Sequence, residues 1–235
     1  MDSLFSQVQI GRHTLSNRMF MAPMTRSRSH RNPFLTARRI IMSYEKFSAD
    51  NAALLLIDHQ VGTMGWVKSI PFEELKRNAL MLAKAASILK LPVVLTSSME
   101  EYAQGPLLSE LEQILPAEFA SRIKRLGIVN AMDDEHFAAA VKATGRKKLI
   151  IAGVTNDVCT VYPALSLVRE GYEVQVVADG GGSPSVMADD IALRRMDKGG
   201  VTLTTTNQLI AELAGSWATP QGGQLVQVLM EALQG

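Results

Sequence analysis

The sequence has a single cysteine, Cys159, among its 235 residues. One cysteine excludes an internal disulfide framework and any metal site made of several thiolates. Aromatic residues make up only 6% of the chain, which argues against a stacking platform for single-stranded nucleic acid. The net charge of +1 shows no excess of one sign that would favour nucleic acid or a membrane surface as a partner. The sequence also lacks any run of about 20 apolar residues that would span a membrane.

What the sequence has is the composition of an ordinary globular protein, with 47% hydrophobic and 20% charged residues. Its charge is divided unevenly. Residues 1–44 contain seven arginines and one acidic residue and carry +6, whereas residues 45–235 contain 17 basic and 22 acidic residues and carry −5. We therefore expect these two parts to be different units. An Arg-rich, acid-poor start is also typical of an organellar transit peptide, which is the lesser alternative.

Short apolar runs alternate with segments of helical periodicity from residue 51 onward. The apolar runs predict strands at 52–57, 92–97, 122–126, 149–152, 173–178 and 201–205. The segments between and after them predict helices at 71–90, 107–115, 133–144, 156–170, 183–198 (with Ser183 as N-cap) and 207–213. Continuous apolar strands are buried on both faces, and strands that alternate with helices form parallel sheets covered on both sides. The predicted fold class is therefore α/β, with a doubly wound parallel sheet.

Ligands of doubly wound sheets bind beyond the carboxyl ends of the strands. Asp58, Arg125 and Cys159 each lie at such an end, so a carboxylate, a guanidinium and the only thiol converge on one edge of the sheet. Cys159 is expected in the first turn of a helix that begins near Asn156, where free amide groups and the positive helix end would lower the pKa of its thiol. Asp58 is then the candidate base that forms the thiolate.

Each of these residues also has a purely structural interpretation. A lone cysteine is most often buried and unreactive, Asp58 could cap a turn, and Arg125 could be a surface charge. In a functional site, Arg125 would hold the carboxylate and the thiolate in place or bind a substrate anion, because its permanent charge makes it a poor proton carrier. The three residues by themselves leave the functional and the structural interpretation evenly matched.

Three motifs add a family resemblance. They are Leu-Leu-Leu-Ile-Asp-His-Gln at residues 54–60, Asn-Ala at 130–131, and Leu-Ile-Ile-Ala-Gly-Val-Thr-Asn-Asp-Val-Cys at 149–159. Together they resemble the isochorismatase-like cysteine hydrolases, in particular the YcaC-type branch, over about residues 45–215. The resemblance implies a three-layer α/β/α sandwich and a catalytic triad of Asp58, Arg125 and Cys159. The middle member is lysine in most of the family, so the adjacent Lys124 is the alternative to Arg125.

The resemblance also implies a chemistry. The family has a cis peptide bond that corresponds to Val154–Thr155, and this would aim the Thr155 amide, together with that of Cys159, at a developing oxyanion. Gln60 and Asn130 are further binding candidates from the same motifs. Members that hydrolyse isochorismate lack the cysteine, so its presence favours hydrolysis of an amide, carbamoyl or imide C–N bond of a small molecule through a covalent thioester. The alternative is a non-catalytic binding or oligomerising module with a vestigial triad.

No metal and no other cofactor is expected. Relatives that bind metal have an Asp-x-His motif and a further histidine, whereas here His59 follows the candidate base directly and the next histidine along the chain is His136. His59 is expected to pack or hydrogen-bond near the base. The glycines 180–182 match no phosphate-binding motif and predict a flexible active-site loop. Two further loops, at 63–67 and 98–104, are expected to supply walls of the substrate pocket.

The segment at residues 4–31 resembles a different family, the Old Yellow Enzyme ene-reductases. In that family the Ala-Pro-Met-Thr stretch, here residues 22–25, lies against the flavin. The rest of the eight-stranded barrel is missing, so the barrel cannot close and we predict no flavin binding. Residues 1–41 are therefore predicted to be an appendage.

We expect residues 42–214 to form the hydrolase domain and residues 215–235 to form a tail. The tail has an apolar stripe that either covers a subunit boundary or docks as a terminal helix. The expected protein is a cytoplasmic homo-oligomer that acts on a small molecule, without a nucleic-acid or membrane partner.

Overall fold

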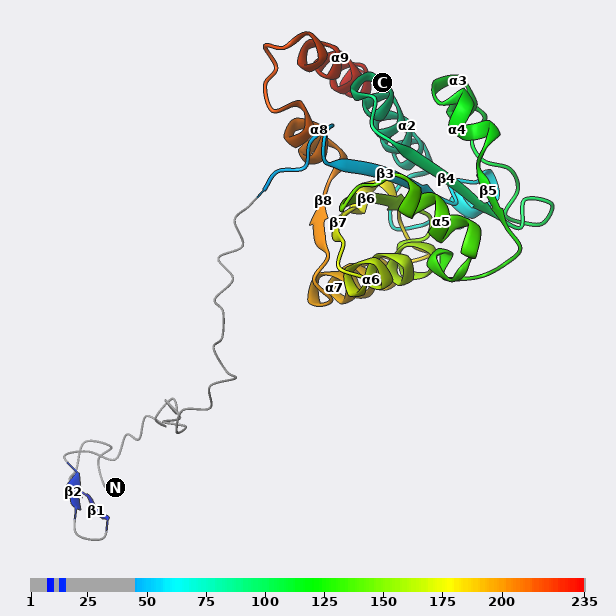
Figure 1. The fold of residues 1–235 in the computed structure, drawn as a ribbon. Helices are drawn as coiled ribbons and strands as arrows, with labels where there is room; N and C mark the ends of the chain where they lie inside the picture. Colours follow the sequence, from blue (N-terminus) through cyan, green and yellow to red (C-terminus); the bar gives the residue numbers. More distant parts are fainter. Residues whose placement is uncertain (1–7, 11–12, 16–44, 235) are drawn as a thin grey trace. The chain divides into compact units, whose positions relative to one another are not determined.

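The computed structural model in Figure 1 describes residues 8–10, 13–15 and 45–234 of the chain. The chain divides into two units, Met1–Tyr44 and Glu45–Gly235. In the first unit, strand β1 (Val8–Ile10) pairs antiparallel with strand β2 (His13–Leu15). The remainder of the segment that resembles an ene-reductase lies outside the described residues, and so does the predicted domain boundary at residue 41.

The second unit is organised around a six-stranded sheet. Its strands are β3 (Ala52–Ile57), β4 (Val93–Ser98), β5 (Ile123–Arg125), β6 (Lys148–Gly153), β7 (Glu173–Val177) and β8 (Thr202–Thr204). Every pairing is parallel, and the spatial order is β5-β4-β3-β6-β7-β8. The predicted doubly wound parallel sheet is confirmed.

The direction of winding reverses between the two central strands, β3 and β6. From β3 the chain continues through β4 to β5 at one edge, and from β6 it continues through β7 to β8 at the other edge. A reversal of this kind leaves a crevice beyond the carboxyl ends of the two strands. Ile57 and Gly153 face each other in register at these ends. The residues that follow, beginning with Asp58 and Val154, therefore meet at the crevice.

Helices cover both faces of the sheet and produce the predicted three-layer sandwich (Figure 1). They are α1 (Val61–Gly65), α2 (Phe72–Leu89), α3 (Ser109–Ile114), α4 (Pro116–Ala120), α5 (Glu135–Ala143), α6 (Val161–Arg169), α7 (Val186–Lys198), α8 (Thr206–Ala214) and α9 (Pro220–Gln234). None of the described helices combines the length and apolar character that a membrane crossing would need.

Alternate residues of β3 belong to two different hydrophobic clusters. Leu54 packs in a cluster with Leu82 of α2, whereas Leu55 packs in another cluster with Leu167 of α6. Because both faces are covered, all six residues of β3 are buried. This double burial explains why the strand is a continuous apolar run rather than an alternating one.

One helix begins later than its sequence predicts. The helix predicted from Ser183 begins at Val186, because Ser185 is the N-cap: its hydroxyl oxygen accepts a hydrogen bond from the Ala188 N–H at 3.1 Å. Ser183 instead donates from its hydroxyl to Asp189 Oδ1 at 2.7 Å. The Ser183 N–H also donates to Ser69 Oγ at 2.9 Å, so both serines have cap chemistry and a contact across the chain decides between them.

The helix predicted at 156–170 begins with a π-type turn, Asn156–Thr160, that precedes α6. The Thr160 N–H donates to the Thr155 carbonyl oxygen, five residues back, at 3.0 Å. Such turns are frequent at functional sites. This one contains Cys159, so the cysteine does not sit in a regular first turn of an α-helix.

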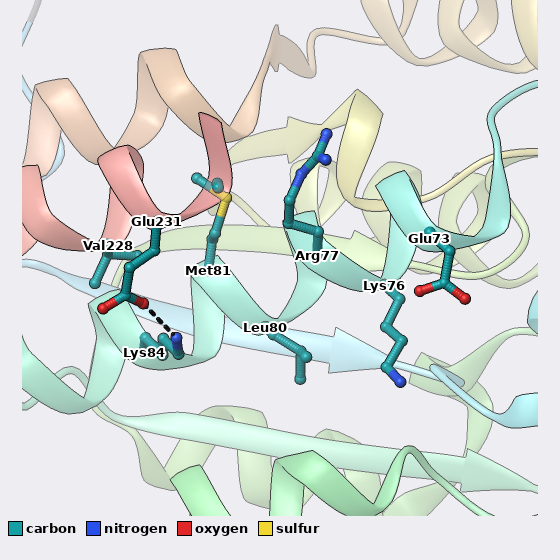
Figure 2. Close-up of a pocket in the computed structure, with 9 residues that line it drawn as sticks. Glu73, Lys76, Arg77, Leu80, Met81, Lys84, Val228 and Glu231 are labelled. Atoms are coloured by element: carbon teal, nitrogen blue, oxygen red, sulfur yellow. Dashed lines mark hydrogen bonds and ion pairs between the residues drawn. The ribbon is translucent and has the colours of Figure 1, made fainter. Parts of the chain in front are cut away.

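The tail ends in α9, whose apolar residues pack on α2 of the same chain. Leu225 and Val228 are buried in a cluster with Met81 of α2. Lys84 and Glu231 form an ion pair across the two helices at 2.9 Å, as Figure 2 shows. This part of the stripe is therefore covered within the chain, as a docked terminal helix would be.

Candidate active site

Asp58 occupies the first position after β3 and turns the chain sharply. Its φ angle is 57°, in the left-handed region that few residues other than glycine, asparagine and aspartate adopt. Its N–H donates to the Thr96 carbonyl oxygen of β4 at 3.0 Å, and its own carbonyl oxygen accepts from the Gln60 N–H at 2.7 Å. The side chain of Asp58 is only 1% exposed. The strand end therefore places a carboxylate in the interior, where it needs a cationic partner.

That partner is Arg125, the last residue of β5. Its Nη2 donates to both carboxylate oxygens of Asp58, and its Nε donates to Thr96 Oγ1 at 3.0 Å. Its Nη1 donates to the Ile128 carbonyl oxygen at 2.5 Å. The neighbouring Lys124 instead pairs with Glu100 at 2.9 Å, and its side chain is 55% exposed. The geometry therefore selects Arg125, not Lys124, as the cation beside Asp58.

Cys159 lies beside the Asp58 carboxyl group and lines the same cavity, close enough that the negative charge of Asp58 acts on its thiol. The backbone amide of Thr155 is also near the sulfur and acts to lower the pKa of the thiol. Asp58, Arg125 and Cys159 therefore meet at one point, although they come from the ends of three different strands. This is the convergence that the strand-end argument predicts.

The pKa of the Cys159 thiol is raised, and the prediction of a lowered thiol pKa was wrong. Burial is the largest cause, and the negative charge of Asp58 adds to it; the positive charge of Arg125 and the Thr155 amide act in the opposite direction but are weaker. Burial also raises the pKa of Asp58, against the influence of Arg125. Burial therefore favours the uncharged form of both groups, while Arg125 favours the ionised form of Asp58.

The peptide bond between Val154 and Thr155 is cis. Val154 is buried and bridges to Gly182, whereas Thr155 lines the space in front of Cys159. The Thr155 amide is near the Cys159 sulfur, because it acts on the pKa of that thiol. An amide donor is therefore present next to the atom that would attack a substrate.

Gln60 and Asn130 do not line that space. The side chain of Gln60 is buried, donates to the Ser98 carbonyl oxygen at 2.9 Å and accepts from the Ser98 N–H at 2.8 Å. It therefore fixes the chain around the site. Asn130 donates to Ser166 Oγ at 3.1 Å, and its Oδ1 accepts from the Met132 N–H at 3.2 Å as an N-cap. Neither amide is directed at a ligand, so both are placed as structural supports.

His59 and the glycines at 180–182 are buried and contact each other next to the site. His59 is fully buried and Nε2 hydrogen-bonds to the Gly180 carbonyl oxygen at 2.8 Å, while burial lowers its pKa to about 4. A Cβ on Gly181 would come within 2.3 Å of Asn156 Oδ1 and of the Gly153 carbonyl oxygen. The run is glycine because the backbone approaches its neighbours closely, and the predicted flexible loop is instead buried.

A cavity of about 290 Å³ opens in front of the three residues. Besides Asp58, Arg125, Thr155 and Cys159, its lining contains Thr63, Trp66, Ser98, Gln104, Gly127, Ile128, Val129, Asp157, Val158 and Pro184. The two expected loops at 63–67 and 98–104 thus supply part of the wall.

Sequence reasoning missed the rest of this lining. The signal for Asp157 was available, because it lies inside the motif that carries Cys159, but a motif does not reveal which of its side chains face a ligand. Among the residues that the structure describes, no three side chains of His, Cys, Asp or Glu gather at a point where they would hold a metal.

Comparisons with known proteins agree with this fold. The YcaC gene product from Escherichia coli, reported as an octameric hydrolase of unknown specificity, has a similar structure: the TM-score is 0.76 at 38% identity, over 81% of this chain and 94% of that one. YcaC from Pseudomonas aeruginosa, in complex with hexane-2,5-diol and covalent acrylamide, has a TM-score of 0.75 at 36% identity, over 82% of this chain and 99% of that one.

Sequence comparison leads to the same group. The protein named probable hydrolase YcaC, from Escherichia coli (strain K12), is 40% identical over 174 residues, which are 74% of this chain and 83% of the relative. The isochorismatase domain profile matches residues 52–208. This match does not include residues 4–31, so their resemblance to an ene-reductase stays a prediction. On the profile match and the identity to YcaC, the chain belongs to the isochorismatase domain family.

Proposed function

We propose that this protein is a cysteine hydrolase that cleaves the C–N bond of a small amide, carbamoyl compound or imide through a thioester on Cys159. The observation that carries the proposal is the meeting of the thiol with a buried, arginine-bound carboxylate at the wall of a cavity. A nucleophile beside an oriented base is the general arrangement for covalent catalysis.

The first half of the reaction begins from the protonated thiol. As Cys159 Sγ forms a bond to the carbonyl carbon, the thiol proton passes to Asp58, and the carbonyl π electrons move to the oxygen. The Thr155 and Cys159 amides donate hydrogen bonds to this oxyanion, and the nearness of the Thr155 amide to the sulfur supports this role. The C–N bond then breaks, the nitrogen takes the proton from Asp58, and the amine leaves behind a thioester.

The second half regenerates the thiol. A water molecule gives a proton to Asp58 as its oxygen attacks the thioester carbon. The C–S bond breaks, the sulfur recovers the proton from Asp58, and a carboxylic or carbamic acid leaves. Arg125 keeps its proton throughout and holds the carboxylate through its two-point contact. The raised pKa of Cys159 is compatible with this cycle, because the thiolate forms only as the bond to carbon forms.

The relative from Pseudomonas aeruginosa supports the proposal, because its structure contains covalently attached acrylamide. Acrylamide is a small neutral amide and also an electrophile, and covalent attachment requires a nucleophile in that protein. In the present chain, Cys159 is the one thiol that would play the corresponding part.

An activity screen over small amides, carbamates and imides tests the proposal, with Cys159→Ala protein as the blank. We expect release of an amine or ammonia with at least one compound, and no release above background by the variant. A substrate that Cys159→Ala protein turns over at the full rate contradicts the thioester mechanism. Absence of turnover for every compound, together with tight reversible binding, favours the alternative of a binding module.

We further propose a homo-oligomer in a reducing compartment such as the cytoplasm. The related YcaC gene product from Escherichia coli is octameric, which supports assembly of this chain as well. The mechanism needs the Cys159 thiol in its reduced form, and thiols stay reduced in compartments where disulfides do not persist. Light scattering coupled to gel filtration tests the assembly, and a monomer at micromolar concentration would contradict it.

A further inference from the structure

The cavity carries one more negative charge than its catalytic groups need. Among the described residues that line it, the charged ones are Asp58, Arg125 and Asp157. The guanidinium of Arg125 is held by Asp58, by Thr96 Oγ1 and by the Ile128 carbonyl oxygen. Asp58 and Arg125 therefore neutralise each other, and Asp157 leaves the lining with a net charge of one negative unit.

Two oxygen atoms of the lining are buried without a hydrogen-bond partner in the described part of the chain. They are Oδ1 of Asp157, in the π-type turn, and Oγ1 of Thr63, in α1. Thr63 is only 4% exposed. Buried polar atoms are nearly always satisfied in folded proteins, and these two oxygens leave hydrogen-bonding capacity beside the cavity that a ligand can use. A carboxylate oxygen accepts only, so its partner must be an N–H or O–H donor.

The remaining wall is mainly apolar. Trp66, Ile128, Val129, Val158 and Pro184 contribute to it, and the first four keep more than a third of their surface exposed. An apolar wall with few polar groups is typical of sites for small organic molecules. The wall accommodates the body of a ligand, while Asp157 and Thr63 accommodate its polar end.

We propose that Asp157 is a specificity-determining residue that selects ligands with a neutral or cationic N–H donor group and rejects ligands with a carboxylate. Thr63 provides a second polar contact, as donor or acceptor. The proposal rests on the proposed function only in taking this cavity as the substrate site. It requires no chemical step, and binding alone tests it.

Three ligands of nearly the same shape separate the charges: benzamidine as its cation, neutral benzamide, and the benzoate anion. The chain has two tryptophans, Trp66 and Trp217. Protein with Cys159→Ala and Trp217→Phe therefore reports binding at the cavity through Trp66 fluorescence, without covalent reaction. In this parent protein we expect the cation to bind about tenfold or more tightly than the anion, with the neutral amide between them.

Asp157→Asn in the same parent removes the charge and keeps the size of the side chain. We expect it to bring the dissociation constants of benzamidine and benzoate to within about threefold of each other. Asp50→Asn is the matched control, because it removes the same charge from the chain. Asp50 is exposed in the turn before the amino end of β3, whereas the site lies beyond the carboxyl end of that strand. This control should leave the order of affinities unchanged.

Several outcomes would overturn the inference. They are benzoate binding as tightly as benzamidine in the parent, an Asp157→Asn variant that keeps the full charge preference, and no saturable change with any of the three ligands. The preference of the parent is informative by itself if Asp157→Asn does not fold. If the cavity selects ligands by charge but no turnover depends on Cys159, only the proposed function is wrong. If turnover depends on Cys159 but the cavity does not select by charge, only this inference is wrong.

Discussion

Arg125 Nη2 donates to both carboxylate oxygens of Asp58, and each of the two side chains is 1% exposed. Such a pair is retained at a high desolvation cost and gives little net stability compared with apolar residues of the same size. Removal of one partner is nevertheless severe, because it leaves a buried charge uncompensated. The pair is therefore better explained by the use of the carboxylate beside Cys159 than by stability.

Replacement of the base should slow the reaction strongly, and it should also lower stability because the guanidinium of Arg125 loses its partner. For Asp58→Asn we expect a fall in kcat of about 10²–10⁴-fold, because the amide cannot take the thiol proton. Steady-state kinetics on a substrate from the screen measures this, with circular dichroism to verify folding. Asp50→Asn serves as control, because Asp50 lies before the amino end of β3, away from the site. An Asp58→Asn variant with undiminished kcat would remove Asp58 from the mechanism.

The same substitution should make Cys159 more reactive toward a simple alkylating agent. The charge of Asp58 contributes to the raised thiol pKa, so its removal lowers that pKa and increases the thiolate fraction at pH 8. Each unit by which the pKa falls corresponds to about tenfold more thiolate while the pH stays below it. The rate of iodoacetamide labelling, followed by mass spectrometry, should therefore be higher in Asp58→Asn than in the unchanged protein. A slower rate would contradict the assignment of charges.

Loss of the guanidinium should destabilise the fold. Arg125→Met leaves the carboxylate of Asp58 buried without its cation, and we expect a loss of about 3–5 kcal/mol in the free energy of unfolding. Lys124→Met is the matched control, since Lys124 is 55% exposed and its ion pair with Glu100 contributes about 1 kcal/mol or less. Urea titration measures both. If the two substitutions lower the free energy of unfolding equally, the buried ion pair contributes no more to stability than the exposed one.

The buried His59 should make stability depend on pH. Its pKa is lowered to about 4 in the folded protein, from the ordinary histidine value of 6.5, because burial disfavours the charged ring. The unfolded chain binds a proton that the folded chain rejects, so the contribution is fully present above pH 6.5 and is lost as the pH falls toward 4. Between pH 7.5 and pH 5 we expect a loss of about 2 kcal/mol from this group.

Comparison of variants isolates the part that His59 plays. His59→Gln should weaken the pH dependence in urea titrations at the two pH values, whereas His136→Gln, at an exposed position, should not. If the unchanged protein and His59→Gln lose the same free energy between the two values, the neutral buried ring is not the cause.

The fold was predictable because the central strands can be recognised from the sequence pattern alone. Strands β3 and β6 are buried on both faces, and this double burial appears in the sequence as uninterrupted apolar runs. The start of α7 was harder to predict, since Ser183 and Ser185 both have cap chemistry and the contacts of Ser183 with Asp189 and with the distant Ser69 distinguish them. Local patterns predict elements, while contacts across the chain decide their ends.

The site divides in the same way. Asp58, Arg125 and Cys159 were predictable because each lies at a strand end, and the sheet brings these ends together. The raised pKa of Cys159 was not predictable from its place in a helical turn, because it depends on burial and on a carboxylate about 100 positions earlier in the chain. The position of Asn130 within a motif suggested a ligand contact, whereas its amide caps a turn outside the cavity lining, which a motif alone does not reveal.

The central claim is that substrate becomes attached to Cys159 as a thioester. Acid quenching during turnover of a substrate from the screen, followed by peptide mapping with mass spectrometry, tests it most directly. The account predicts the mass of the acyl group on the peptide that contains Cys159. In Cys159→Ser protein this mass should appear only slowly, as an ester. Full turnover by Cys159→Ala protein, or an acyl group found on another residue, would contradict it.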